Sequence, residues 1–292
     1  MTTRLMICII GAILAAQALL SGFPAFAEDA FIESGGVKIR YTDQGRGEPV
    51  VLLHGLLGTL EMNWEDTGIA AVLATDYRVI AIDLRGHGKS GKPHDPLSYG
   101  FDMVKDVLRV MNHLEIEKAH FLGYSLGATI TVKLMVSFPE RVASALLGGG
   151  GWTKPGNKAD LEFVTQVADS LESGKGIGPV IRHMTPKGQK PPSDEEIAMI
   201  NESITADNDV KAMACVFRGM PELFVAEELI RNNHLPCLAL VGEKDPAKLS
   251  VDLLKKAKPG LKTVIIEGAD HMSAIVHPEL LEEVKAFLAE KR

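Results

Sequence analysis

The pattern of apolar and polar residues begins with a strict alternation. Val37-Lys38-Ile39-Arg40-Tyr41 alternates with a period of two residues, which is typical of a half-exposed antiparallel strand at the edge of a sheet. Gly35-Gly36 precedes it and supplies the two residues of a tight hairpin turn. We therefore expect a hairpin between this strand and Ala30 to Glu33, followed by a turn over Asp43 to Gly47.

The next apolar segments are continuous rather than alternating. Such runs indicate strands covered on both faces, as in a parallel sheet. They occupy Pro49 to Leu53, Tyr77 to Ile82, Ala119 to Leu122, Val142 to Leu147, Leu235 to Val241 and Lys262 to Ile266. Because helical patterns separate them, the sequence predicts an α/β fold with a doubly wound, mostly parallel sheet, which a terminal helix over Glu282 to Leu288 closes.

This rhythm breaks after the sixth strand, where residues 152–234 carry only helical patterns. Phe163, Val167 and Leu171 recur at every fourth position, and Ser193 to Glu196 form a capping box. We predict a helical lid over 152–234 inserted into a core of 28–151 and 235–292; the alternative is that these helices belong to the core. The glycine run Gly148 to Gly151 permits either a hinge or a tight loop.

The first 27 residues resemble an export signal rather than part of the fold. Arg4 precedes an apolar run from Leu5 to Leu20, and Ala25-Phe26-Ala27 is a small-x-small cleavage pattern. An uncleaved anchor is the alternative, but this run is shorter than the roughly 20 residues that span a bilayer. We predict a signal peptide over 1–27, export to the periplasm or the medium, and no stable membrane span after its removal.

Composition limits the possible functions. The chain has 292 residues, of which 46% are hydrophobic and 24% charged, so it can bury a sizeable core. Its formal charge of −7 and the absence of a basic stripe argue against binding nucleic acid. Without Cys8 of the predicted signal, Cys215 and Cys237 are left; we expect buried free thiols, with a disulfide as the alternative.

The central chemical feature is Gly123-Tyr124-Ser125-Leu126-Gly127, which lies between a predicted strand and a predicted helix. A serine at such a bend sits in a strained backbone with little space around it, so flanking glycines are a requirement of close packing. Ser125 is therefore the candidate nucleophile.

Two further residues follow the last two predicted strands. Asp245 comes just after one strand and His271 just after the next, and groups at the carboxyl ends of adjacent parallel strands converge on one crevice. A serine hydroxyl needs a base to remove its proton, and a histidine needs an acid on its other ring nitrogen. We predict His271 as the base and Asp245 as the acid. Asp270 ranks lower, because adjacent loop residues seldom aim their side chains at each other.

With Ser125, Asp245 and His271 in this order, the chain resembles the α/β-hydrolase family, specifically its lidded, esterase-like branch. The resemblance runs from about Val37 to Ala286. Besides the bend at Gly123 to Gly127, which we call the elbow, the resemblance rests on five further motifs. They are His54 to Gly58, Asp83 to Ser90, Pro139 to Val142, Gly242-x-x-Asp245 and Gly268-x-x-His271.

The tetrahedral intermediate needs amide donors for its oxyanion. Leu126, directly after the nucleophile at a helix start, should supply one N–H group, and the resemblance implies Leu56 as the second. Serine at the nucleophile position disfavours dehalogenases and epoxide hydrolases, which use aspartate there. The loop Gly55 to Gly58 lacks both the His-Gly-Gly-Gly run of another esterase branch and the Gly-Gly-Pro-Gly type of proline iminopeptidases.

The remaining histidines receive structural interpretations. We expect loop-bracing hydrogen bonds from His54 and His87, a satisfied core position for His120 and a surface position for His277. No motif surrounds the others, which are His94, His113, His183 and His234.

Substrate contacts are the least determined part of the site. Trp64, Tyr124 and Trp152 are the candidate pocket residues. An apolar acyl pocket in the lid is a weaker possibility, with plain lid core as the alternative, for Phe163, Val164, Met184, Met199, Met213, Phe217, Met220 and Phe224. The sequence contains no motif for a metal or a cofactor, so we expect none.

The sequence thus predicts an exported serine hydrolase that cleaves small ester-like substrates through an acyl-enzyme. Lactonases, carbon-carbon bond hydrolases and perhydrolases with the same triad are alternatives. A receptor that binds a ligand on a hydrolase scaffold is a further alternative.

Overall fold

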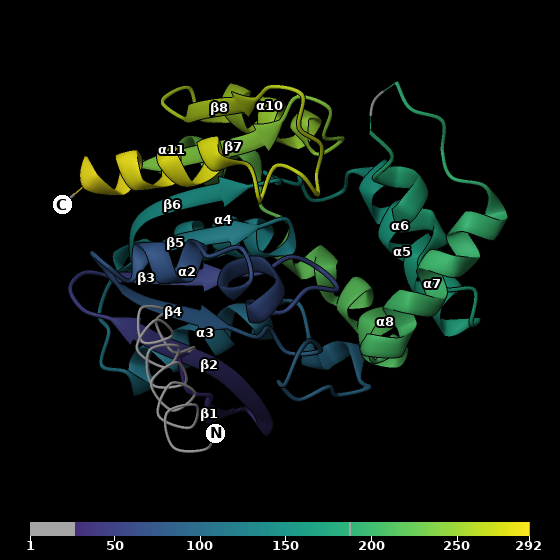
Figure 1. Ribbon diagram of the computed structural model, residues 1–292, viewed down its shortest axis with the longest axis horizontal. Coiled ribbons are helices and arrows are strands. Elements are labelled where there is room, and N and C mark those ends of the chain that lie inside the picture. The colour runs from purple at the N-terminus through teal and green to yellow at the C-terminus, as the bar shows by residue number, and fades with distance from the viewer. Residues whose placement is uncertain (1–26, 187, 292) are drawn as a thin grey trace, which may run out of the picture.

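The computed structural model describes residues 27–186 and 188–291 (Figure 1). Apart from Ala27, the predicted signal peptide lies outside the described residues. In the part of the chain that is described, no helix is both long and apolar enough to cross a membrane.

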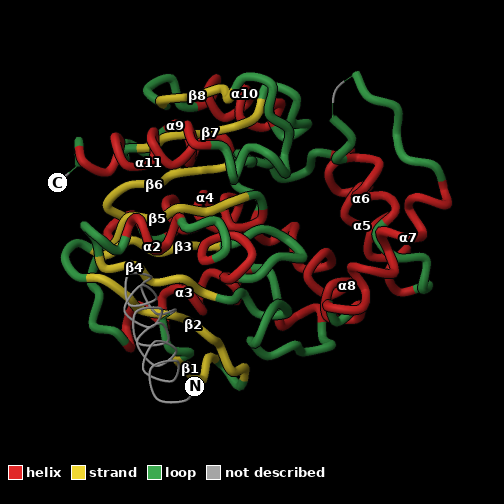
Figure 2. Tube along the Cα trace, viewed as in Figure 1, coloured by secondary structure: helices red, strands yellow, loops and turns green. Residues whose placement is uncertain are grey.

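The core is an eight-stranded sheet in the order β1-β2-β4-β3-β5-β6-β7-β8. The first two pairings, β1 with β2 and β2 with β4, are antiparallel, and all the others are parallel. Figure 2 shows the strands of the sheet in yellow. This confirms the predicted mostly parallel α/β sheet. The strands are β1 Ala30–Ser34, β2 Val37–Gly45, β3 Pro49–Leu53, β4 Arg78–Ile82, β5 Ala119–Tyr124, β6 Val142–Gly148, β7 Cys237–Gly242 and β8 Lys262–Ile266.

The continuous apolar runs serve both faces of the sheet. In β3, Val51 and Leu53 point into one core cluster, whereas Val50 and Leu52 point into another on the opposite face. Helices α3, α4 and α10 supply the first cluster, and helices α2 and α11 supply the second. Their bounds are α2 Ile69–Leu73, α3 Phe101–His113, α4 Leu126–Ser137, α10 Lys248–Ala257 and α11 Pro278–Ala289.

The N-terminal hairpin is confirmed, but β2 differs from its prediction in two ways. Gly35 and Gly36 have φ of 61° and 81°, as a tight hairpin turn requires. The antiparallel edge of the sheet is β1 rather than β2, the predicted edge strand. Strand β2 is an inner strand between β1 and β4. It also extends through Gly45, which was expected in a turn but pairs with Arg78. An added Cβ at Gly45 would lie 2.2 Å from the Tyr77 carbonyl oxygen, so only glycine allows this close pairing.

Helices α5 to α9 follow β6 and precede β7 along the chain. Their bounds are α5 Lys158–Glu172, α6 Gly178–His183, α7 Asp194–Asp207, α8 Val210–Gly219 and α9 Glu227–Arg231. The first four, which we call the helical insertion, stand to one side of the sheet (Figure 1). Helix α5 packs on α8, and the capping box at Ser193 is present at the start of α7.

Two hydrogen bonds join the chain segments at the two ends of the helical insertion. Trp152 Nε1 donates a hydrogen bond to the Val225 carbonyl oxygen at 2.7 Å. The Val225 amide in turn donates to the Thr153 carbonyl oxygen at 3.0 Å. The segment that enters the insertion and the segment that leaves it are therefore bonded to each other. Cys215 and Cys237 are both buried and free, as the sequence suggested.

Candidate active site

Ser125 occupies a sharp bend between β5 and α4. Its backbone has φ 53° and ψ −110°, a conformation that costs a non-glycine residue about 1 to 3 kcal/mol. A Cβ added to Gly123 would lie 2.2 Å from the Gly127 carbonyl oxygen. A Cβ added to Gly127 would lie 2.0 Å from the Leu53 carbonyl oxygen. Both glycines are therefore required by packing, because a methyl group at either position would overlap the backbone.

Asp245 and His271 lie together after β7 and β8. Asp245 Oδ2 is 2.8 Å from His271 Nδ1, and Asp245 Oδ1 accepts from the Ala247 amide at 2.8 Å. The Asp245 side chain is fully buried, whereas the His271 side chain is 13% exposed. Because a carboxylate can only accept, His271 carries its proton on Nδ1, which leaves Nε2 as an acceptor. This is the arrangement that a general base requires.

The Asp270 carboxylate is turned to its own loop. It accepts from the Ser273 amide at 2.9 Å, the Ser273 hydroxyl at 2.7 Å and the Met272 amide at 3.1 Å. These bonds, led by that from the Ser273 hydroxyl, lower the pKa of the Asp270 carboxyl. Asp270 therefore holds the turn that carries His271 rather than pairing with its ring.

Ser125 is fixed through its backbone. Its amide donates to the Gly148 carbonyl oxygen at 2.8 Å, and its carbonyl oxygen accepts from the Thr129 amide at 3.1 Å. In the described part of the chain, no hydrogen bond joins the Ser125 hydroxyl to His271. Active sites without substrate commonly show this looser spacing, which tightens when a substrate binds.

The loop after β3 lies against the nucleophile. An added Cβ at Gly55 would be 3.3 Å from Ser125 Cβ, so glycine lets the loop approach. The Gly55 amide donates to Asn63 Oδ1 at 2.7 Å, which fixes the loop. Among the described residues, the amides of Leu56 and Leu126 donate to no backbone carbonyl. Both are therefore available to an oxyanion, and Leu126 opens α4, whose N-terminus favours negative charge.

The two histidines of the glycine-rich loops brace these loops, as expected. His54 Nδ1 donates to the Gly55 carbonyl oxygen at 2.7 Å, and Nε2 accepts from the Leu84 amide at 3.0 Å. His87 Nδ1 donates to the Arg85 carbonyl oxygen at 3.1 Å. Both rings are fully buried, and burial lowers both pKa values, that of His87 to about 3. Neither ring is suited to accept a proton at neutral pH.

The other histidines also lie in structural positions. His120 is buried and its Nδ1 is 2.7 Å from the Ser144 hydroxyl, which confirms a satisfied core position. His277 is the exposed N-cap of α11. His94 pairs with Asp209 at 2.9 Å, and the ring of His183 stacks on Phe163.

Trp64, Tyr124 and Trp152, the predicted pocket residues, make contacts inside the protein. All three side chains are buried, with exposures of 0%, 4% and 6%. Trp64 packs in the core cluster beneath β3, and Trp152 ties the base of the helical insertion through Val225. Tyr124 donates a hydrogen bond to the His271 carbonyl oxygen at 2.5 Å. Their contact with a substrate stays a prediction.

The sequence motifs contain only part of a buried charge cluster near the Gly55 loop. Asp83 accepts from the amides of Leu60 and Lys89 at 2.9 and 2.8 Å, and from Arg40 Nη1 at 3.0 Å. Arg40 also pairs with Glu61 at 2.6 Å and with Asp29. Asp83 belongs to a motif that the sequence displays, whereas Arg40 and Asn63 lie outside the motifs.

These features agree with the comparison with known families. The family model for the α/β-hydrolase fold matches residues 48–175. The chain has the fold of this family, and its relatives support a hydrolase. The elbow at Ser125 and the loop at His54 both fall inside the matched segment.

Among its relatives, this α/β hydrolase is 29% identical over 266 residues to 2-hydroxy-6-oxo-6-(2'-aminophenyl)hexa-2,4-dienoic acid hydrolase of Metapseudomonas resinovorans, covering 86% of this chain and 87% of the relative. It is 26% identical to 3-oxoadipate enol-lactonase 2 of Acinetobacter baylyi, covering 78% and 84% of the two chains. A carboxylesterase structure from Nitrososphaera gargenis matches with a TM-score of 0.72 and 23% identity, over 90% of this chain and 98% of that chain. This last likeness shows the fold.

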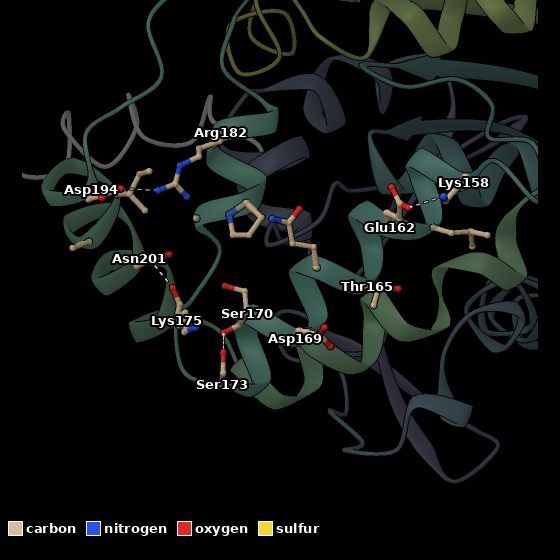
Figure 3. Close-up of a pocket in the computed structure, with 16 residues that line it drawn as sticks. Lys158, Glu162, Thr165, Asp169, Ser170, Ser173, Lys175, Arg182, Asp194 and Asn201 are labelled. Carbon is tan, nitrogen blue, oxygen red and sulfur yellow. Dashed lines mark hydrogen bonds and ion pairs between the residues drawn. The ribbon is translucent and has the colours of Figure 1, made fainter.

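The helical insertion of this α/β hydrolase contains a separate open cavity of about 1020 Å³. Its walls come from α5, α6 and α7. Figure 3 shows Arg182 directed at Asp194, with Asn201 and Ser170 lower in the view. None of its lining residues is a predicted triad or oxyanion residue. The cavity is therefore distinct from the candidate active site.

Proposed function

We propose that this α/β hydrolase is a serine hydrolase that cleaves carboxylic ester-like bonds through an acyl-enzyme. The observation that carries the proposal is the Asp245–His271 hydrogen bond of 2.8 Å. It leaves Nε2 free to accept the proton of the Ser125 hydroxyl. In this proposal Ser125 is the nucleophile, His271 the base and Asp245 the acid.

The chemical steps follow from these roles. His271 Nε2 removes the proton from Ser125 Oγ while Oγ bonds to the carbonyl carbon of the substrate. The carbonyl electron pair moves to oxygen, and the Leu56 and Leu126 amides stabilise the resulting oxyanion. When the oxyanion collapses, the alkoxide leaves and takes the proton from His271. A water molecule then attacks the acyl-enzyme by the same route, releasing the acid and restoring Ser125. Each oxyanion donor contributes about 3 kcal/mol in comparable sites.

A fluorophosphonate probe tests this assignment. We expect stoichiometric labelling of the wild type and none of Ser125→Ala. The matched control is Ser203→Ala, because Ser203 is an exposed serine of α7. An unlabelled wild type would reject the serine hydrolase and favour a ligand receptor on this scaffold.

Carbon-carbon bond hydrolysis is the second candidate function. The relative from Metapseudomonas resinovorans, a dienoic acid hydrolase, aligns over 86% of this chain and supports it. Lactone hydrolysis has similar support from the enol-lactonase of Acinetobacter baylyi. Initial rates with short p-nitrophenyl esters, a lactone panel and a diketone panel separate the three. Faster turnover of a diketone than of every ester and lactone would assign the second function.

We also propose that the helical insertion acts as a lid and selects the substrate, and that the enzyme is exported after cleavage behind Ala27. The small-x-small pattern Ala25-Phe26-Ala27 supports the export proposal. N-terminal sequencing of the enzyme from a native host tests it. A mature chain that begins at Glu28 is the expected result, and an intact Met1 in the cytoplasmic fraction contradicts it.

A further inference from the structure

Tyr124 connects the two loops that carry the proposed nucleophile and base. It precedes Ser125 directly, and its hydroxyl donates a hydrogen bond to the His271 carbonyl oxygen at 2.5 Å. The two rings also lie close, with their centroids 5.4 Å apart and an interplanar angle of 51°. The Tyr124 side chain therefore links the strand end next to the proposed nucleophile to the backbone of His271.

The ring of Tyr124 packs directly on Gly148 and Gly149, which we call its seat. A Cβ added to either glycine would lie 2.7 Å from a carbon of the Tyr124 ring. The glycine run therefore makes room for the ring, which explains two of its four glycines. The Gly149 amide also donates to the Leu240 carbonyl oxygen at 2.9 Å, so the seat is fixed to β7. Only 4% of Tyr124 is exposed, and its direction is set by packing.

The loop of His271 is packed on its inner side, where Ala274 and Ile275 are buried, and is open on its outer side. Met272 is 75% exposed and Val276 is 62% exposed. Inside the loop, Asp270 and Ser273 bond to each other, which stabilises the turn but does not place it. The Asp245 carboxylate orients the ring through Nδ1. Among the described residues, the Tyr124 hydroxyl is the group that donates to the His271 carbonyl oxygen. It adds to the bond of 2.9 Å from the Lys244 amide to the Ala269 carbonyl oxygen, which holds the start of the loop.

We propose that Tyr124 is a positioning residue that sets the separation between Ser125 and the His271 base. This inference rests on the proposed serine hydrolase function. Burial raises the pKa of the Tyr124 hydroxyl, so it stays a donor over the working pH range. Without this donor to the His271 carbonyl oxygen, the loop of His271 can shift. A displacement of the His271 ring by about 1 Å can cost about 100-fold in rate.

The test compares Tyr124→Phe with Tyr99→Phe. Tyr99 is a matched control: it is 1% exposed, and its hydroxyl donates to the Pro93 carbonyl oxygen at 2.7 Å, away from the triad. For Tyr124→Phe we expect kcat on a p-nitrophenyl ester to fall between about 10-fold and about 100-fold, with KM nearly unchanged. The labelling rate of Ser125 should fall by the same factor. Tyr99→Phe should keep both rates. Tyr124→Leu, which also empties the seat, should be slower still.

Hydrogen exchange supplies a readout that does not depend on activity. Tyr124→Phe should speed amide exchange over 270–274, whereas Tyr99→Phe should do so only near Pro93. If Tyr124→Phe labels at the wild-type rate and its loop exchanges normally, the positioning role is wrong while the serine hydrolase stands. If the wild type itself is not labelled, the proposed function fails, and faster exchange then shows only that Tyr124 anchors the loop.

Discussion

The Asp245 carboxylate lies 2.8 Å from His271 Nδ1, although the two residues are 26 positions apart in the chain. They meet because β7 and β8 are parallel neighbours and each is followed at once by a polar loop. Asp270, the sequence neighbour of His271, bonds to Ser273 instead. The sheet, rather than proximity along the chain, thus selects the carboxylate that pairs with His271.

This pairing predicts different effects for two aspartates. Asp245→Asn removes the charge and allows the wrong ring tautomer, so we expect kcat to fall by about 10⁴-fold, as in serine proteases with the equivalent change. Asp270→Asn is the matched control and should stay close to the wild type in rate. Ester hydrolysis and the labelling rate of Ser125 measure both. A larger loss in Asp270→Asn than in Asp245→Asn would reverse the assignment.

The buried histidines predict acid sensitivity. The folded pKa of His87 is about 3 because of its burial, whereas an unfolded histidine titrates near 6.5. Between these values the unfolded chain binds the extra proton, so the free energy of unfolding decreases as pH falls from about 6.5 toward 3. His87 should contribute a slope of up to about 1.4 kcal/mol per pH unit, and His54 acts in the same direction.

Urea unfolding at pH values between 7 and 4 checks this slope. His87→Gln cannot take up the proton, so its stability should depend less on pH than that of the wild type. His277→Gln removes an exposed histidine and serves as the control. Equal slopes for His87→Gln and the wild type would contradict the buried neutral state of His87.

How far the sequence predicts this site depends on the type of residue. Ser125, Asp245 and His271 could be predicted because each follows a strongly apolar strand and parallel strands end at one edge. Their surroundings could not. Arg40 stands in an alternating strand that resembles an exposed edge, and only the order of strands shows that Asp83 faces it. The same strand order places β2 inside the sheet.

The sequence does not determine the role of the large side chains, for a related physical reason. Aromatic bulk near a site suits either a pocket or the core, and composition does not separate the two. The deciding facts are close contacts between distant segments, such as the ring of Tyr124 on Gly148 and Gly149. These contacts depend on the twist and spacing of β5 and β6, which no local pattern encodes.

The elbow predicts a sharp difference between two glycines. In Gly127→Ala the new methyl group would lie 2.0 Å from the Leu53 carbonyl oxygen, so the backbone must move. We expect a loss of about 3 kcal/mol or more in the free energy of unfolding, at or beyond the upper range for overpacking. Gly260→Ala is the control, because its Cβ would have no neighbour within 4 Å. It should be neutral or slightly stabilising. Urea midpoints measure both, and a stable Gly127→Ala would show that the elbow can relax.

A buried ion pair gives the last prediction. Arg85 Nε donates to Asp106 Oδ2 at 2.5 Å, and both side chains are 2% exposed. Arg85→Met leaves the Asp106 carboxylate with the Ser34 hydroxyl and with the half-exposed Arg109, whose Nη1 is 4.0 Å away. We therefore expect a loss of about 3 to 5 kcal/mol at neutral pH. The double variant Arg85→Met/Asp106→Leu should be more stable than the single one, because no charge is stranded.

The pH dependence of this loss identifies its cause. Burial already raises the pKa of Asp106, and removing Arg85, its main cationic partner, raises that pKa further. The folded Arg85→Met protein then binds a proton more readily than its unfolded chain does, so acid favours the folded state. The deficit against the wild type should therefore shrink from pH 7 to pH 5, measured by urea unfolding. A deficit that is constant over this range would mean that lost packing of Arg85, rather than a stranded charge, destabilises the variant.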